Sequence, residues 1–349
     1  MKIILNLLLV VCMGLQTLAA DNQIFKVTAT EANQMTEEAE DFIDDLAEGM
    51  QDKLADGIYH SLRGESRELQ NYRDLIGKSS DLSADITVSN INAGGKLQNV
   101  GMRLFKPTEN KGCLPLLIYF HGGGWNYGNT ETVAPFCTAL AKTGNVMVLS
   151  IDYPLAPEHR YPEAEMTARE VLDYVFEHAI ELGSDKASIS VGGDGAGANI
   201  AIGTILGWQN NSGKDEKVKS LVLYYPIIKK EMGKAGSWKE YNRGYGLDSR
   251  LMESFLEGYG FNPGENTTAE SSSDNPDYKN LPPVLIISAE RDIVFDDGKE
   301  FVENLKKSNG KPLHIIFPGA LHGFITDQTQ KTAFNKSVEI TAEFLSEKQ

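Results

Sequence analysis

Short runs in which nearly every residue is apolar recur along the chain, and they predict the strands of a buried sheet. The first two, 86–91 and 98–105, flank a Gly-Gly pair and predict a hairpin. Six more runs follow, at 116–120, 146–151, 188–191, 220–225, 284–289 and 314–317. An apolar residue at almost every position is typical of parallel strands that are covered on both faces.

Segments with helical periodicity separate most of these predicted strands. Within 163–182 the apolar side chains recur on one stripe, as they do on a helix that packs against a sheet. Segment 196–208 is rich in Ala, Gly and Ile, which predicts a buried helix lying close to the sheet. Apolar repeats predict two later helices, near 301–305 and 334–345. This alternation after an antiparallel pair predicts an α/β sandwich with an open, mostly parallel sheet.

Two segments do not follow the alternation. An acidic stretch at 36–52 carries an apolar residue at every fourth position, which predicts one amphipathic helix with a solvated acidic face. Residues 227–281 contain several aromatic residues and no convincing strand, which favours a lid or cap over a plain loop. We expect this insertion and the N-terminal segment 21–80 to roof a pocket on a main domain at 81–349. A decorative insertion is the alternative.

The first twenty residues predict export. Lys2, an apolar run at 3–15 and two alanines before Asp21 are typical of a secretory signal peptide. The apolar run is shorter than the ~18 to 20 residues that a membrane anchor needs, so we expect no stable membrane span. Lipidation at Cys12 is disfavoured because Val11 stands where a small residue is expected. The expected location is the periplasm or the medium.

Charge and cysteine content narrow the function classes. The chain has 33 Lys and Arg against 49 Asp and Glu, a formal net charge of −16, which disfavours nucleic acid as a partner.

Two cysteines lie beyond the leader, Cys113 and Cys137, and either a disulfide or a free pair is compatible with export. The sequence has no Cys/His cluster with zinc spacing. We expect no metal and no organic cofactor, and the sequence leaves the oligomeric state open.

Motifs with chemical potential follow the predicted strands. HGGGW, at 121–125, comes after the strand 116–120, and its glycines let backbone N–H groups face a ligand. DYPLAPEHRYP, at 152–162, predicts a rigid structural loop. GGDGAGAN, at 192–199, joins a strand to the small-residue helix, where a tight turn would present its central residue, Gly195.

Two further candidates come after this turn in the chain. Asp292 follows the strand 284–289, and His322 follows the strand 314–317. An acid and then a histidine, each at the carboxyl end of a strand, is the order that a hydrolase with a strand-to-helix nucleophile turn requires. The N–H of Ala196 would add an oxyanion donor at the positive end of the helix dipole.

Together these motifs resemble the hormone-sensitive-lipase-like family of α/β-hydrolase esterases, from about residue 80 to the C-terminus. The resemblance implies an α/β-hydrolase fold, with a mostly parallel eight-stranded sheet flanked by helices and a helical cap. It implies hydrolysis of a small-molecule carboxylic ester with a short or medium acyl group. It also implies Asp292 as the acid and His322 as the base of a catalytic triad, with oxyanion donors at Gly123, Gly124 and Ala196.

The chain departs from the family at Gly195, where the family has serine. Glycine offers no atom to attack an ester, and deleting a triad nucleophile costs on the order of a million-fold in turnover. Three interpretations follow. The chain is an esterase whose serine has been replaced, a ligand-binding pseudo-esterase, or a hydrolase in which His322 activates a water molecule. The retained acid, base and donors favour the first interpretation.

Overall fold

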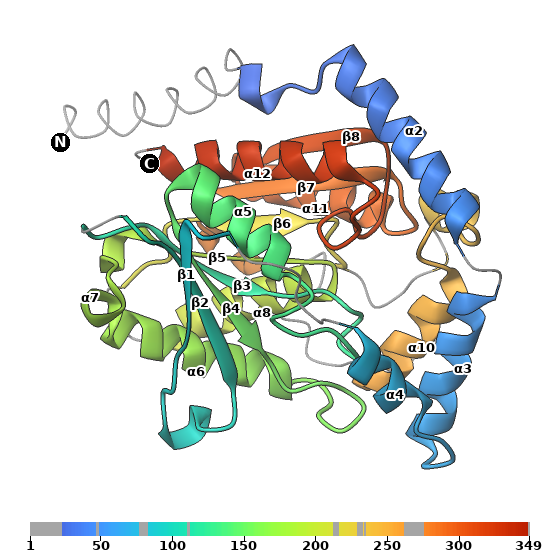
Figure 1. Cartoon of the computed structure of the whole chain (residues 1–349), viewed down its shortest axis with the longest axis horizontal. Coiled ribbons are helices and arrows are strands. Elements are labelled where there is room, and N and C mark those ends of the chain that lie inside the picture. The colour runs from blue at the N-terminus through green and yellow to red at the C-terminus, as the bar shows by residue number, and fades with distance from the viewer. Residues whose placement is uncertain are drawn as a thin grey trace.

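The computed structural model describes residues 23–46, 49–76, 83–109, 112–211, 216–228, 233, 235–261 and 276–347. The predicted signal peptide, 1–20, lies outside the described residues, and so does segment 262–275 of the insertion. The described residues form a central sheet with helices on both sides, and further helices lie along one end of it (Figure 1).

The described residues form eight strands in one sheet, in the order β1-β2-β4-β3-β5-β6-β7-β8. Strand β2 pairs antiparallel with β1 and β4, and the remaining neighbours pair parallel. All eight predicted strands and the leading hairpin are confirmed, with ends that differ by a few residues. The bounds are β1 (Ile86–Asn90), β2 (Gly101–Pro107), β3 (Leu116–Phe120), β4 (Met147–Asp152), β5 (Ile189–Asp194), β6 (Leu221–Tyr224), β7 (Val284–Arg291) and β8 (Leu313–Leu321).

Helices separate the parallel strands and frame the site. Those of the main layers are α5 (Ala134–Gly144), α6 (Glu163–Glu177), α7 (Ala179–Leu182), α8 (Ala196–Asn211), α11 (Phe295–Lys307) and α12 (Lys331–Ser346). The others are α2 (Ala29–Asp45), α3 (Met50–Leu62), α4 (Glu68–Leu75), α9 (Gly236–Glu240) and α10 (Ser249–Tyr259). The described part of the chain also contains four short 3-10 helices, η1 (Gln23–Phe25), η2 (Gly95–Leu97), η3 (Lys186–Ser188) and η4 (Pro276–Asn280).

The central strands of the sheet are buried on both faces, as their continuous apolar runs predicted. In β3, Leu116, Ile118 and Phe120 join the core cluster that contains α6, α8 and α11. The alternate residues Leu117 and Tyr119 join the cluster that contains α5 and α12. Successive side chains of a strand point to opposite faces, so each run of five apolar residues supplies both layers of the core.

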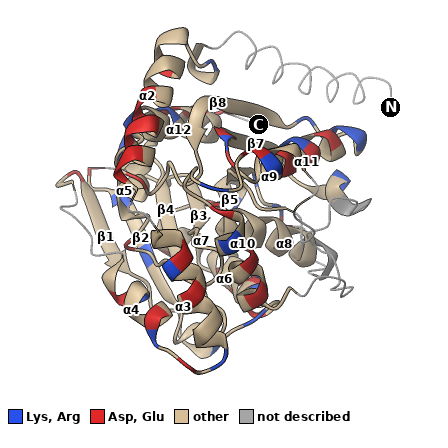
Figure 2. Ribbon diagram, turned by 90° about the vertical axis from the view of Figure 1, so that its right-hand side faces the viewer, with Lys and Arg blue, Asp and Glu red and all other residues tan. Residues whose placement is uncertain are grey.

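The acidic N-terminal stretch differs from its prediction, because it forms two helices instead of one. Helix α2 begins with a capping box between Thr28 and Glu31 and ends at Asp45, and Leu46 is extended. Helix α2 packs along β8, whereas α3 packs against α10. The two helices therefore pack against different elements, and Gly49, which precedes α3, adopts a left-handed conformation. Figure 2 shows acidic residues on both α2 and α3.

The sequence left the pairing of the two cysteines open. Cys113 is exposed and Cys137 is buried, and neither forms a disulfide. Within the described residues, no helix combines the length and the apolar character that crossing a membrane requires.

The environment of His314 in β8 leads us to expect that the free energy of unfolding decreases in mild acid. Burial, with Lys306 and Lys299 nearby, lowers the pKa of its imidazole from about 6.5 to about 4. Because the folded chain resists protonation, the unfolded chain takes up the proton first as the pH falls below 6.5. The free energy of unfolding therefore decreases by up to about 3 kcal/mol between pH 6.5 and pH 4.

Denaturant unfolding at pH 7 and pH 4.5 tests this contribution. We expect His314→Gln to reduce the pH dependence of the free energy of unfolding. The same change at the exposed His159 should leave that dependence unchanged. An equal pH dependence in His314→Gln and the parent protein would contradict the assignment.

Candidate active site

The turn between β5 and α8 has the geometry of a nucleophile turn. Gly195 is its apex and adopts φ +52°, a left-handed conformation that side-chain-bearing residues rarely adopt. A Cβ at Gly197 would overlap the carbonyl oxygen of Phe120, so this position must be glycine for α8 to lie against the end of β3. The predicted tight turn is therefore present, with α8 beginning directly after its apex.

His322 and Asp292, which the sequence predicted as a base and an acid, lie within hydrogen-bond distance of each other. The imidazole Nδ1 of His322 lies 2.7 Å from Asp292 Oδ2. A carboxylate accepts hydrogen bonds, so Nδ1 carries the proton and Nε2 presents its lone pair. The other carboxylate oxygen accepts from the backbone N–H of Val294 at 3.0 Å. Asp292 is 1% exposed, so its orientation is fixed by these two hydrogen bonds in a protected environment.

The Nε2 atom of His322 faces the apex of the turn. A Cβ built at Gly195 would lie 3.3 Å from this nitrogen and 3.9 Å from the ring of Tyr225. A hydroxyl carried on that Cβ would be within hydrogen-bond reach of the imidazole. The tertiary structure thus brings together the three residues that the sequence placed on separate loops.

The three backbone groups expected as oxyanion donors line the same cavity. Gly123, Gly124 and Ala196 all border it. Within the described residues, the N–H groups of Gly123 and Gly124 donate no hydrogen bond. Ala196 is the first residue of α8, so its N–H has no partner inside the helix. Three free donors beside an imidazole are suited to stabilising a developing negative charge.

Asp194 is a structural residue of the site whose role the motif alone did not reveal. Its Oδ1 accepts hydrogen bonds from Tyr119 Oη at 2.8 Å and from the backbone N–H of Gly122 at 2.9 Å. Its Oδ2 accepts from Tyr225 Oη at 3.3 Å. Burial raises the pKa of Asp194, and the hydrogen bond from Tyr119 acts in the opposite direction. This carboxyl group ties the glycine loop to the strand-to-helix turn.

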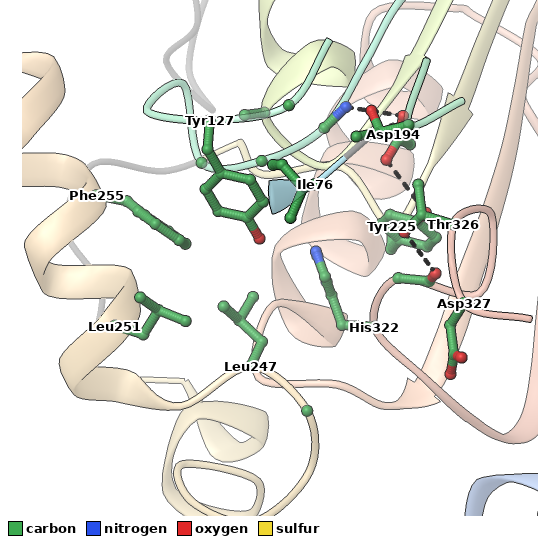
Figure 3. A pocket seen from close by; sticks show the side chains of 18 of the residues that line it. Ile76, Tyr127, Asp194, Tyr225, Leu247, Leu251, Phe255, His322, Thr326 and Asp327 are labelled. Atoms are coloured by element: carbon green, nitrogen blue, oxygen red, sulfur yellow. Dashed lines mark hydrogen bonds between the residues drawn. The ribbon is translucent and has the colours of Figure 1, made fainter. Parts of the chain in front are cut away.

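Tyr225 packs against the side of the His322 ring. Its ring centroid lies 4.5 Å from that of His322, and its hydroxyl accepts from the backbone N–H of Ile325 at 3.3 Å. Figure 3 shows Tyr225 between Asp194 and His322. Because Tyr225 directly follows β6 in an apolar run, nothing in the sequence distinguishes it from a core residue.

The cavity above these groups has a volume of about 730 Å³. Its apolar wall comes from α2, the residue that follows α4, the loop before α10, and α10 itself, through Phe42, Ile76, Leu247, Leu251 and Phe255. Figure 3 shows Leu247, Leu251 and Phe255 across the cavity from His322. Such a cavity accepts a small apolar group next to the imidazole.

Helix α10 is fixed directly on the HGGGW loop. A Cβ at Gly124 would collide with the ring of Phe255, and Asn126 Nδ2 donates to the backbone oxygen of Phe255 at 3.0 Å. The Trp125 ring stacks on Tyr259, with centroids 4.8 Å apart. The position of α10 and the position of the free N–H groups are therefore coupled.

The described residues contain no group of three or more His, Cys, Asp or Glu side chains arranged to hold a metal ion. The polar groups of the cavity include the His322 imidazole, backbone amides, tyrosine hydroxyls and the carboxylates of Glu131, Asp194 and Asp327.

The fold and this arrangement define an α/β hydrolase, and comparison with known proteins agrees. A family model described as an alpha/beta hydrolase fold matches residues 117–326, so the chain belongs to this family. The carboxylesterase NlhH of Mycobacterium tuberculosis is 32% identical over 233 residues, which cover 66% of this chain and 72% of that protein. The ethyl acetate hydrolase of Pseudomonas putida is 28% identical over 228 residues, 64% of this chain and 71% of that protein.

Solved structures show the same relationship. The Pyrobaculum calidifontis esterase superposes with a TM-score of 0.71 at 28% sequence identity. The superposition covers 82% of this chain and 94% of that one. The family expected from the motifs is thereby confirmed.

Proposed function

We propose that this chain has the active site of a carboxylic ester hydrolase and that Gly195 occupies the position of its nucleophile. One observation carries the proposal. The Cβ position at Gly195 lies 3.3 Å from His322 Nε2, while His322 Nδ1 is held by Asp292 at 2.7 Å. The similarity to a carboxylesterase and an ethyl acetate hydrolase supports the same reaction.

With a hydroxyl at position 195, the site would carry out acyl transfer. The hydroxyl oxygen attacks the ester carbonyl carbon while His322 Nε2 takes its proton, and the alcohol leaves with that proton. Asp292 stabilises the imidazolium, and the N–H groups of Gly123, Gly124 and Ala196 bind the carbonyl oxygen as its charge grows. Water, activated by the same imidazole, then releases the acid.

With glycine at this position, the first bond cannot form through residue 195. The chain retains every other group, because the imidazole, the carboxylate and the free N–H groups are all in place. We infer that the chain is an esterase whose nucleophile has been replaced, and that its own turnover of esters is severely impaired.

The cavity supports a short or medium acyl group. Its volume of about 730 Å³ lies within the range of small-molecule sites, roughly 300 to 1,000 Å³. Helices α2, α4 and α10 contribute Phe42, Tyr72, Leu251, Met252 and Phe255 to its wall. We infer that the N-terminal segment and the insertion together form a cap that defines the acyl pocket.

Export remains part of the proposal. It is supported by the leader-like pattern of the first twenty residues, with Lys2 before an apolar run and two alanines before Asp21. An exported ester hydrolase acts on esters that reach the periplasm or the medium.

Covalent labelling tests the proposed function. A fluorophosphonate reacts with a serine hydroxyl that an adjacent base activates. We expect Gly195→Ser to be labelled at position 195, as located by mass spectrometry of the digested protein. The unaltered chain and Gly195→Ser/His322→Ala are expected to remain unlabelled. Equal labelling with and without the His322→Ala change would overturn the proposed role of His322.

A further inference from the structure

A second cavity, of about 490 Å³, lies next to the catalytic cavity. It is formed by residues 90–92, 98–103, 129–131 and 152, and we call it the polar cleft. Most of its lining is polar, whereas the wall of the catalytic cavity facing His322 is apolar. The two cavities therefore suit different parts of one molecule.

The sheet topology places the polar cleft on the same edge as the catalytic groups. Strand β1 ends at Asn90 and β4 ends at Asp152, and β2, running the other way, begins at Gly101. The register pairs Asn90 with Arg103 and Gly101 with Asp152, so these strand ends lie side by side. The carboxyl end of β5, which carries the Gly195 turn, lies farther along the same edge.

Glu131 joins the two cavities, because it lines both of them. One of its carboxylate oxygens pairs with Arg103. The other oxygen, Oε2, is buried and has no hydrogen-bond partner among the described residues. The neighbouring residue is also fixed, since the N–H of Thr130 donates to Asp152 at 2.6 Å. A buried carboxylate oxygen without a donor is an open acceptor at the junction.

The chemistry of the cleft matches hydroxyl groups. Four exposed amide side chains line it, and none of them has a hydrogen-bond partner among the described residues: Asn90, Asn92, Gln98 and Asn99. An amide both donates and accepts, as a hydroxyl does. The charged groups are Arg103, Glu131 and Asp152, one cation and two anions, so an anionic ligand is disfavoured. A neutral polyhydroxyl group is the best match.

We propose that the polar cleft binds the alcohol part of the ester and that this part is a sugar or another polyol. The inference rests on the proposed function. The acyl group occupies the apolar cavity, the carbonyl carbon lies between Gly195 and His322, and the sugar extends past Glu131 into the cleft. The substrate class is therefore an O-acylated carbohydrate rather than an ester of an apolar alcohol.

Direct binding to the unaltered chain tests this assignment without requiring turnover. Isothermal titration calorimetry compares three ligands, mono-O-acetylated trisaccharides of glucose, xylose and mannose, with hexyl acetate. We expect at least one sugar ester to bind more tightly than hexyl acetate. The double variant Asn90→Leu/Asn99→Leu should weaken that binding about tenfold, through the loss of hydrogen bonds from two amides.

Asn33→Leu provides the matched control, because it makes the same change at an exposed amide on α2, outside the cleft. It should bind the sugar ester as the parent chain does. In the Gly195→Ser protein, the ratio of kcat/KM for the sugar ester to kcat/KM for p-nitrophenyl acetate should fall about tenfold with the double variant.

Two results would overturn the cleft as a sugar site. One is that no sugar ester binds better than hexyl acetate, and the other is that the double variant binds a sugar ester as tightly as the parent. Failure here is distinguishable from failure of the proposed function. Fluorophosphonate labelling without sugar binding would support the esterase site and contradict the sugar site. Sugar binding without labelling would support the sugar site and contradict the esterase site.

Discussion

Gly195→Ser is expected to raise kcat for p-nitrophenyl acetate by on the order of a million-fold over the unaltered chain. The imidazole, its carboxylate partner and the free N–H groups are already in position, so one hydroxyl completes the site. The new Cβ would lie 3.3 Å from His322 Nε2, and the ring must move by only a few tenths of an ångström. Initial rates at saturating substrate give kcat for both proteins.

Gly195→Ala is the matched control for this gain. It imposes the same Cβ and the same strain at φ +52° but supplies no hydroxyl. We expect it to be folded and to hydrolyse esters no faster than the unaltered chain. A similar gain in Gly195→Ala would show that the hydroxyl is not the nucleophile. Strong activity of the unaltered chain that His322→Ala abolishes would instead support a water molecule activated by His322.

Asp292→Asn, introduced into the Gly195→Ser protein, is expected to lower kcat about 10⁴-fold. The amide Oδ1 can still accept from the N–H of Val294, so the loop keeps its shape. The amide nitrogen, however, donates to His322 Nδ1, which moves the imidazole proton to Nε2. The imidazole then has no lone pair to accept the hydroxyl proton. Steady-state kinetics should show the loss in kcat, with KM little changed.

Asp327→Asn tests whether this loss is specific. Asp327 also borders the cavity, but its carboxylate accepts from Thr329 instead of from His322. We expect kcat of this variant to stay close to that of the Gly195→Ser parent. Comparable losses in the two variants would point to the overall charge of the cavity rather than to the orientation of His322.

The predicted strands were accurate because each one is marked by a pattern of apolar residues within a few consecutive positions. Runs such as 116–120, apolar on every residue, identified buried strands because both faces of a central strand are covered. The error was to predict one helix for the acidic stretch 36–52, because its apolar repeat continues past the end of α2 at Asp45 into α3. An apolar residue at every fourth position is compatible with one helix or with two. The contacts of α2 with β8, and of α3 with α10, favour two helices.

The sequence by itself determined the alternation of strands and helices, the tight turn at Gly195 and the order of Asp292 and His322 along the chain. These follow from periodicities and from backbone conformations that act over a few residues. Only the tertiary structure decided that His322 Nε2 faces Gly195, that Asp194 holds the glycine loop, and that Asn90 and Asp152 border one cleft. Such distances depend on the strand order of the sheet, because it places strand ends that are far apart in the chain along one edge.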